Sequence, residues 1–99
     1  MRDGATYDIA CLEPFSLAPG ERAIVRTGVA VDLPSGMVGL VLPRSRLAFE
    51  HGVTVINAPG LVEPGYGGEL GVILVNLGTD VFLAEAGELI AMLLLVPFS

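Results

Sequence analysis

Short runs rich in Val, Ile and Leu, separated by proline and glycine turns, limit what this chain can fold into. No helical period lasts beyond about one turn, so the pattern predicts an all-β chain. The expected strands are Tyr7–Leu12, Ala23–Leu33, Met37–Leu42, Val53–Ile56, Glu69–Leu77, Val81–Leu83 and Leu89–Val96. Turns are expected at Pro19-Gly20, Pro34-Ser35-Gly36, Pro59-Gly60, Pro64-Gly65 and Gly78-Thr79-Asp80. With no linker or repeat between them, these strands predict one domain over residues 1–99, a jelly-roll-like sandwich or a distorted barrel.

Two segments depart from this strand-and-turn pattern. Residues 45–50 form the one place where a short helical turn is plausible, with Ser45 as its N-cap. The stretch from Gly52 to Asn76, GVTVINAPGLVEPGYGGELGVILVN, sets a turn-rich loop between two apolar strands. Glu63 is the only acidic side chain in that loop before its final turn. Loops of this kind carry function more often than the strands around them, so we expect this one to hold a ligand.

The chain has more apolar side chain than a domain of its size can hide. It is 53% hydrophobic and 16% charged, whereas a chain this short buries only about 60–65% of its unfolded surface. A subunit interface is therefore expected to cover part of the apolar surface. The alternative, a membrane span, is disfavoured because the longest apolar run, Leu89 to Phe98, is too short and contains Pro97. The N-terminus lacks an apolar signal region, so we expect a soluble protein that is not secreted by a visible signal.

Charge and the rare residues narrow the chemistry. The net charge of −6 and the absence of Lys argue against a broad nucleic-acid surface. Arg44 and Arg46 could still form a compact anion site, although they could equally be solvated or pair with Glu50. With His51 as the only histidine, one chain cannot assemble a zinc cluster or a Ser-His-Asp triad. The lone Cys11 forms no internal disulfide and is expected in the core.

Carboxylate chemistry remains after this screen. Asp8 or Glu63 could hold a magnesium ion through water or activate a water molecule, while arginines and backbone amides hold an anion. Asp8 lies in the strand segment TYDIA, where the alternative is an outward-facing strand residue without a special role.

The ordered segments resemble the trimeric deoxyuridine triphosphatase (dUTPase) family over nearly the whole chain. ATYDIACLEPFSLAPGERAIVRTGVAVDLPSGMVGLVLPRSRLA is similar to that family's first two motifs, GVTVINAPGLVEPGYGGELGVILVNLG to the third, and AGELIAMLLL to the fourth. The resemblance implies a jelly-roll subunit in a homotrimer. In the family, three active sites lie between subunits, and each draws motifs from more than one chain.

Carried over by position, the resemblance implies the following roles. Asp8 corresponds to the aspartate linked to the magnesium site through water, and Arg44 and Ser45 to the pair that contacts phosphate. Asn57 and Tyr66 correspond to residues that line the uracil-deoxyribose pocket, and Gly68 and Glu69 of the same motif are present. Glu63 occupies the place of the water-activating aspartate and so would be the catalytic base.

Several positions depart from the family pattern. Arg46 replaces a glycine that lets backbone approach the phosphates, and Glu63 is one C–C bond, about 1.5 Å, longer than the family's aspartate. Leu89 and Met92 stand where the family places an arginine and a phosphate-contacting glutamine. The chain ends at Ser99, before any glycine-rich fifth motif, and lacks the family's first N-terminal strand. A misplacement of about 1 Å can cost on the order of 10² in rate, so these departures predict impaired catalysis.

The related deoxycytidine triphosphate deaminases share this fold and a similar turn, EPGYGGELGVILVN, and a similar ending, VPFS. The position that matches their essential glutamate is Ile73, so deamination is not expected.

Two functional hypotheses follow. The departures favour a homotrimer that has lost catalysis, needs no cofactor and serves as a structural module, for example a decoration protein on a phage capsid shell in the virion. The alternative is an active, cytoplasmic, magnesium-dependent enzyme that splits dUTP into dUMP and pyrophosphate. A regulatory protein that senses a nucleotide without hydrolysing it is a third possibility.

Overall fold

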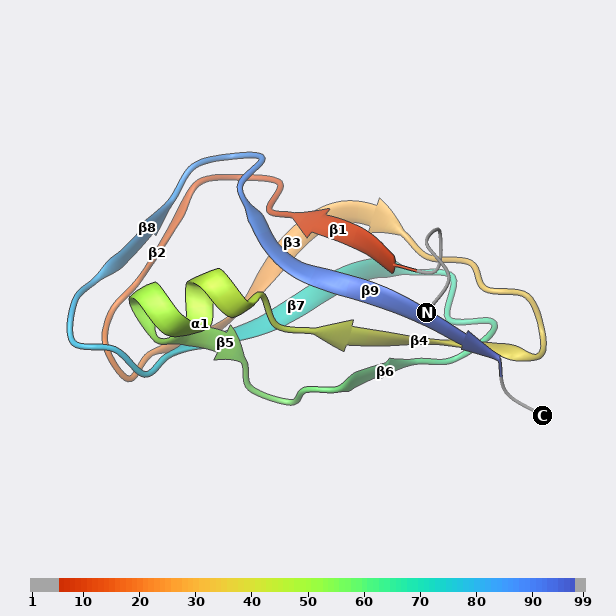
Figure 1. Ribbon diagram of the computed structural model, residues 1–99. Coiled ribbons are helices and arrows are strands. Elements are labelled where there is room, and N and C mark those ends of the chain that lie inside the picture. Colours follow the sequence, from red (N-terminus) through yellow and green to blue (C-terminus); the bar gives the residue numbers. More distant parts are fainter. Residues whose placement is uncertain (1–5, 98–99) are drawn as a thin grey trace.

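The structure is a computed structural model that describes residues 6–97. Its strands confirm the all-β prediction and fit a jelly-roll-like fold (Figure 1). The strands are β1 Thr6–Ala10, β2 Phe15–Leu17, β3 Arg22–Ala30, β4 Met37–Leu42, β5 Val53–Val55, β6 Gly60–Val62, β7 Glu69–Asn76, β8 Phe82–Ala84 and β9 Leu89–Pro97. One short helix, α1, spans Ser45–His51. No helix within residues 6–97 has the length and apolar character needed to cross a membrane.

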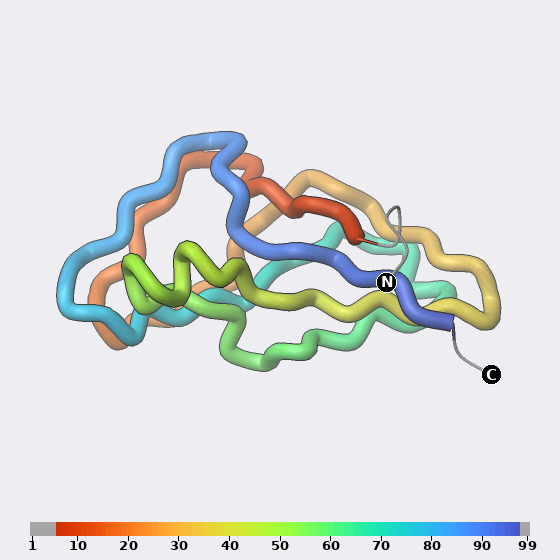
Figure 2. The backbone as a smooth tube through the Cα atoms, viewed as in Figure 1, coloured from red at the N-terminus to blue at the C-terminus, as the bar shows by residue number. Residues whose placement is uncertain are grey.

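Three antiparallel sheets make up the fold. The four-stranded sheet has the order β1-β9-β4-β6, the three-stranded sheet β3-β7-β5, and the two-stranded ribbon β2-β8. The last strand, β9, runs between β1 and β4, so strands far apart in sequence lie side by side (Figure 1). The β2-β8 ribbon lies at the opposite end of the molecule from the C-terminal end of β9 (Figure 2).

The core lies between the inner faces of the four-stranded and three-stranded sheets. Alternation along the strands turns one set of side chains inward, as expected for a pleated strand with one face buried. Ile9 and Val41 are buried on one sheet, and Val72 and Leu74 on the other. Leu47 anchors α1 to the same core, which also includes Cys11, as predicted. Removing a side chain like that of Leu74 would cost about 2–5 kcal/mol.

A buried polar residue joins the ribbon to the three-stranded sheet. The side chain of Asn76 is fully buried. Its Nδ2 donates to the carbonyl oxygens of Leu17 and Asp80, each at 2.8 Å, and its Oδ1 accepts from the Gly78 N–H at 2.8 Å. Because all of these polar atoms have partners, the amide fixes the end of β7 without an unsatisfied group.

The outer face of the four-stranded sheet is apolar. Residues directly opposite each other in neighbouring strands share a face, so the register places Asp8, Met92 and Leu42 together on this side. Apolar side chains, all half-buried except the exposed Leu61, cover the rest of it. We call this surface the outer face; its apolar members are Val38, Leu40, Leu42, Leu61, Met92, Leu94 and Val96.

Some local predictions were wrong. β2 and β6 were not predicted because both are short, and Gly60, read as part of a turn, begins β6 by pairing with Val41. The expected cap at Ser45 is also wrong, since Ser45 is the first helical residue. The N-cap is Arg44, in extended conformation and without a side-chain capping bond. The strand after Gly78-Thr79-Asp80 begins at Phe82, one residue later than expected.

Candidate functional site

A pocket opens between the four-stranded and three-stranded sheets. Its volume is about 140 Å³. Val41 and Val62 line one side, and the start of β7 lines the other. Asn57 and Tyr66 add the polar side chains. A hollow that combines apolar side chains with a few polar groups is typical of a site for a small molecule, in which the polar groups fix the orientation.

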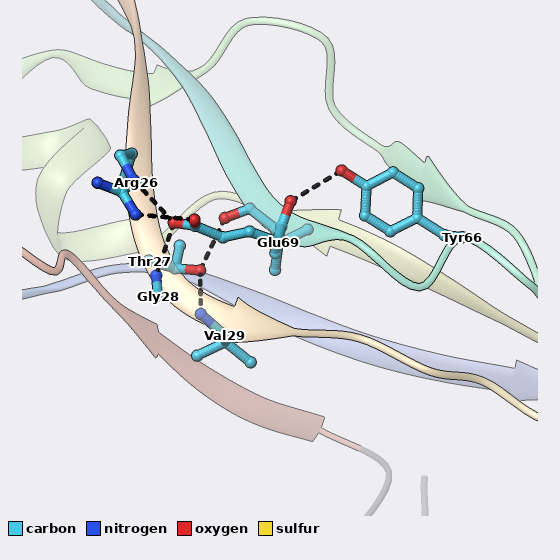
Figure 3. Close-up of polar contacts among 7 residues, drawn as sticks. Arg26, Thr27, Gly28, Val29, Tyr66 and Glu69 are labelled. Atoms are coloured by element: carbon cyan, nitrogen blue, oxygen red, sulfur yellow. Dashed lines mark hydrogen bonds and ion pairs between the residues drawn. The ribbon is translucent and has the colours of Figure 1, made fainter.

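Tyr66 stands on the turn that borders this pocket. Its backbone N–H donates to the Glu63 carbonyl at 3.2 Å, and its hydroxyl donates to the Glu69 carbonyl at 2.8 Å (Figure 3). The ring lies against Gly68, where an added Cβ would be 3.4 Å from ring atom Cζ. Gly68 therefore supports the ring. Tyr66 remains 54% exposed, so the ring can contact a ligand.

Asn57 reaches the same pocket from the segment before β6. A Cβ placed on Gly60 would lie 3.3 Å from Asn57 Nδ2 and 3.4 Å from Val41 Cβ. The glycine thus lets the amide come close to the wall of the pocket. Asn57 and Tyr66, to which the family resemblance assigns one pocket, both line this hollow.

Asp8 and Arg44 meet on the outer face. Asp8 is directly opposite Met92, which is itself opposite Leu42, and Arg44 follows Leu42 by two residues. Arg44 Nη1 donates to Asp8 Oδ1 at 2.8 Å. The side chains are 26% and 58% exposed, respectively. We call these two residues the outer ion pair. Their one contact uses one guanidinium nitrogen and one carboxylate oxygen.

The structure also shows where the other residues of the second and fourth motifs lie relative to the outer ion pair. Ser45 is exposed at the start of α1. Arg46 Nε lies 3.3 Å from Glu50 Oε1, so the pairing alternative is the one that Arg46 adopts. Met92 lies beside Asp8 on the outer face, whereas Leu89 pairs with Ala10 at the far end of β9. Of the two arginines in this segment, Arg44 therefore pairs with Asp8, whereas Arg46 pairs with Glu50.

The donors present fit a magnesium ion that arrives with phosphate groups. Mg²⁺ prefers oxygen ligands and usually keeps several waters, held by one or two carboxylates and by substrate phosphates. The exposed Asp8 carboxylate offers such an oxygen. Within residues 6–97 no group of three or more His, Cys, Asp or Glu residues could hold a metal by themselves. The chemistry of this donor set therefore matches a metal bound partly by the ligand.

Glu63 lies apart from the outer ion pair. Gly39 of β4 is opposite Val62 of β6, so Glu63, one residue after Val62, is level with Val38. Arg44 is six residues after Val38 in the sequence. At about 3.3 Å per residue this places the backbone of Arg44 roughly 20 Å from that of Val38.

The pocket and the outer ion pair lie on opposite faces of the four-stranded sheet. Val41 is buried and lines the pocket on the inner face, whereas the outer ion pair lies on the other side. One chain therefore cannot present its pocket and its outer ion pair to the same small molecule.

Glu69, which the sequence identifies only as part of a motif, makes contacts that the sequence does not predict. Its carboxylate accepts from Arg26 Nε at 3.1 Å, from Arg26 Nη2 at 3.0 Å and from the Gly28 N–H at 2.9 Å (Figure 3). We call Arg26, Gly28 and Glu69 the Glu69 cluster. The Arg26 guanidinium and then the Gly28 N–H lower the pKa of Glu69. The bond to Glu69 likewise raises the pKa of Arg26. An isolated glycine within a predicted strand was the signal available, because it indicates a bulge.

Comparison with known proteins decides the family. A family model described as dUTPase matches residues 1–99. The chain belongs to the dUTPase family. It is similar to the deoxyuridine 5′-triphosphate nucleotidohydrolase of Cutibacterium acnes, at 48% identity over 98% of this chain and 64% of that protein. The corresponding protein of Anaeromyxobacter sp. is 48% identical over 96% of this chain and 65% of that protein. The chain thus spans just under two thirds of these relatives.

Solved dUTPase structures have the same fold. One is a mutant dUTPase from phage phi11 of S. aureus, described with a structural Mg(II) ion. It matches all of this chain and 82% of its own, with a TM-score of 0.89 and 26% identity. The dUTPase of Streptococcus mutans matches equally well in extent, with a TM-score of 0.88 and 25% identity.

These findings overturn the favoured hypothesis from the sequence. The prediction of a non-catalytic structural module is wrong, because the relatives at about 48% identity are named as nucleotidohydrolases over nearly the full length of this chain. The comparisons do not support a capsid partner, a virion location or a protein without a cofactor. The departures at Arg46, Glu63, Leu89 and Met92 do not outweigh the similarity of the whole chain to these relatives.

Proposed function

We propose that this chain forms a site that hydrolyses dUTP to dUMP and pyrophosphate. The observation that carries this proposal is the pocket, which brings Asn57 and Tyr66 together beside the turn that contains Glu63. The names of the relatives support the same reaction. In this proposal the uracil and deoxyribose occupy the pocket, with Tyr66 as the wall on the sugar side.

Glu63 is the proposed general base. It is exposed in the turn after β6, and in this proposal its carboxylate activates a water molecule at the pocket. The carboxylate takes a proton from that water as the water oxygen attacks phosphorus, and pyrophosphate leaves. A positioned base of this kind contributes about 10²–10⁴-fold to a rate. The turn closed by the Tyr66 N–H bond to Glu63 gives the longer Glu side chain a fixed starting point.

The outer ion pair is the proposed triphosphate site. Arg44 can direct further N–H groups to phosphate oxygens, and the Ser45 hydroxyl follows it directly. Asp8 would hold Mg²⁺ through water. When bound, the ion neutralises charge on the triphosphate and so eases attack.

A homotrimer completes the site in this proposal. The pocket and the outer ion pair lie on opposite faces of one sheet, so the outer ion pair must serve the pocket of a neighbouring copy. The outer face supports such contacts, since it is apolar and Leu61 on it is 58% exposed. Apolar surface of this kind marks an association site. Three copies agree with the arrangement that the family resemblance implies.

Pyrophosphate release from a set of nucleotides tests the proposed function. The full chain is incubated with dUTP, dCTP, dTTP or UTP in the presence of Mg²⁺. Release from dUTP at a rate well above the other three, and its loss on adding a chelator, is the expected result. Absence of release from dUTP, or equal release from dCTP, would contradict the proposal.

A further inference from the structure

β3 contains a bulge opposite the start of β7. Arg26 pairs with Gly71 and Ala30 pairs with Glu69, so three residues of β3 oppose one residue of β7. Gly28 takes a φ of +74°, a conformation that favours glycine. A bulge removes backbone groups from the ladder, and those groups need other partners.

Side chains supply the missing partners on both sides of Gly28. Thr27 Oγ1 donates to the Leu70 carbonyl at 2.7 Å and accepts from the Val29 N–H at 3.1 Å. Glu69 accepts from the Gly28 N–H while the Arg26 guanidinium holds both of its carboxylate oxygens. The fork geometry fixes the carboxylate in one orientation, as a bidentate pair does.

Tyr66, which lines the pocket, lies on the turn before Glu69. The Glu69 carbonyl accepts from the Tyr66 hydroxyl, and the Gly68 carbonyl accepts from the Val31 N–H at 3.3 Å. The Gly67 N–H donates to the Val31 carbonyl at 3.2 Å. The turn that carries Tyr66 is therefore attached to Val31, directly after β3. Tyr66 is also bonded to Glu69, which is itself bonded to the bulge (Figure 3).

We infer that Glu69 is a positioning residue for the nucleotide: through Arg26 and Gly28 it fixes the Tyr66 ring against the sugar side of the pocket. The inference rests on the proposed function. The alternative is that the Glu69 cluster only adds stability. Exposed ion pairs contribute little to stability, and Arg26 is 60% exposed, so stability alone gives the cluster a small role. A displaced Tyr66 ring would instead affect binding directly.

Steady-state kinetics of Glu69→Ala test this inference. Residues that orient a binding group typically contribute 10–100-fold, so the KM for dUTP should rise about tenfold. The kcat should change less than about threefold, because the loss falls on a contact made equally in the ground and transition states. The preference for dUTP over UTP should fall with the loss of a fixed wall at the sugar. Glu69→Gln, which keeps an oxygen for the Gly28 N–H, should recover part of the KM.

Glu21→Gln is the matched control. Glu21 Oε1 also accepts a backbone N–H in an exposed turn, from Ala18 at 2.8 Å, but it does not touch the pocket. This variant should keep the wild-type KM and the wild-type preference for dUTP. Unchanged kinetics in folded Glu69→Ala, or an equal rise of KM in Glu21→Gln, would overturn the inference.

Amide hydrogen exchange separates this inference from the proposed function. In Glu69→Ala the amides of Gly28, Tyr66 and Gly67 should exchange faster than in the wild type, while the amide of Asn76 in the core should not. If the wild type fails to hydrolyse dUTP, the proposed function falls and exchange alone decides whether Glu69 fixes the turn. Unchanged exchange at Tyr66 and Gly67 would contradict that role.

Discussion

The outer ion pair and the Glu69 cluster both combine an arginine with a carboxylate from segments far apart in the sequence, yet they are bonded in different ways. In the outer ion pair, Arg44 and Asp8 share one contact of 2.8 Å. In the Glu69 cluster, the carboxylate accepts three hydrogen bonds from Arg26 and Gly28. A carboxylate with most of its acceptor positions unused can still bind a ligand or a metal-bound water, whereas one that already accepts three hydrogen bonds is held in one orientation by the fold. The number of contacts thus separates binding groups from positioning groups.

Glu63→Gln should have the largest effect. The amide cannot take a proton from water, so kcat should fall by about 10²–10⁴-fold. The KM for dUTP should stay near the wild-type value, because Glu63 is exposed and is not part of the pocket lining. Initial rates of pyrophosphate release measure this. Retention of full kcat would show that another group activates water.

Arg44→Ala should have the next largest effect. Removing one charged donor from a developing anion typically costs about 10²–10³ in kcat. The melting temperature should hardly change, since an exposed ion pair adds at most about 1 kcal/mol. Kinetics and thermal unfolding are measured on the same sample. A large loss of stability with little loss of rate would reverse the assignment of the two ion pairs, because the outer ion pair would then be the one that holds the fold.

The pH dependence of stability should show the smallest effect. The contacts of Glu69 lower its pKa in the folded state. The cluster therefore adds stability above the ordinary pKa of a glutamate, and this stability is lost as the pH falls through the lowered pKa. The difference in melting temperature between the wild type and Glu69→Gln should shrink as the pH is lowered through that range. A difference that is constant from neutral to acid pH would mean that the ionised carboxylate contributes nothing.

The sequence predicts the parts of the fold that local pattern controls. β4 and β7 are continuous apolar strands between glycine and proline turns, and both lie where the pattern put them. β2 and β6 depend on pairing with β8 and β4, so three-residue segments without strong propensity become strands only in the assembled sheet.

The candidate site shows the same limit. Resemblance to the family pointed to Asp8, Arg44, Asn57 and Tyr66, but only the long-range register of β1, β9 and β4 places the first two in contact. The contacts of Glu69 arise from a bulge at which Gly28 is the local sign, but its partners follow only from the register of β3 and β7. The separation of Glu63 from Arg44 within one chain likewise follows from the pairing of β4 with β6.

Mixing two variants that are each inactive is the most direct test of whether each site is built from two copies of the chain. Glu63→Gln chains and Arg44→Ala chains are unfolded and refolded together, and the wild type is treated in the same way as a control. If each site takes Glu63 from one copy and Arg44 from another, random assembly restores about one site in four, so about a quarter of the wild-type rate should return. If the mixed oligomer forms and its rate stays at the level of the separate variants, Glu63 and Arg44 act within one chain. The proposed site between two copies is then wrong.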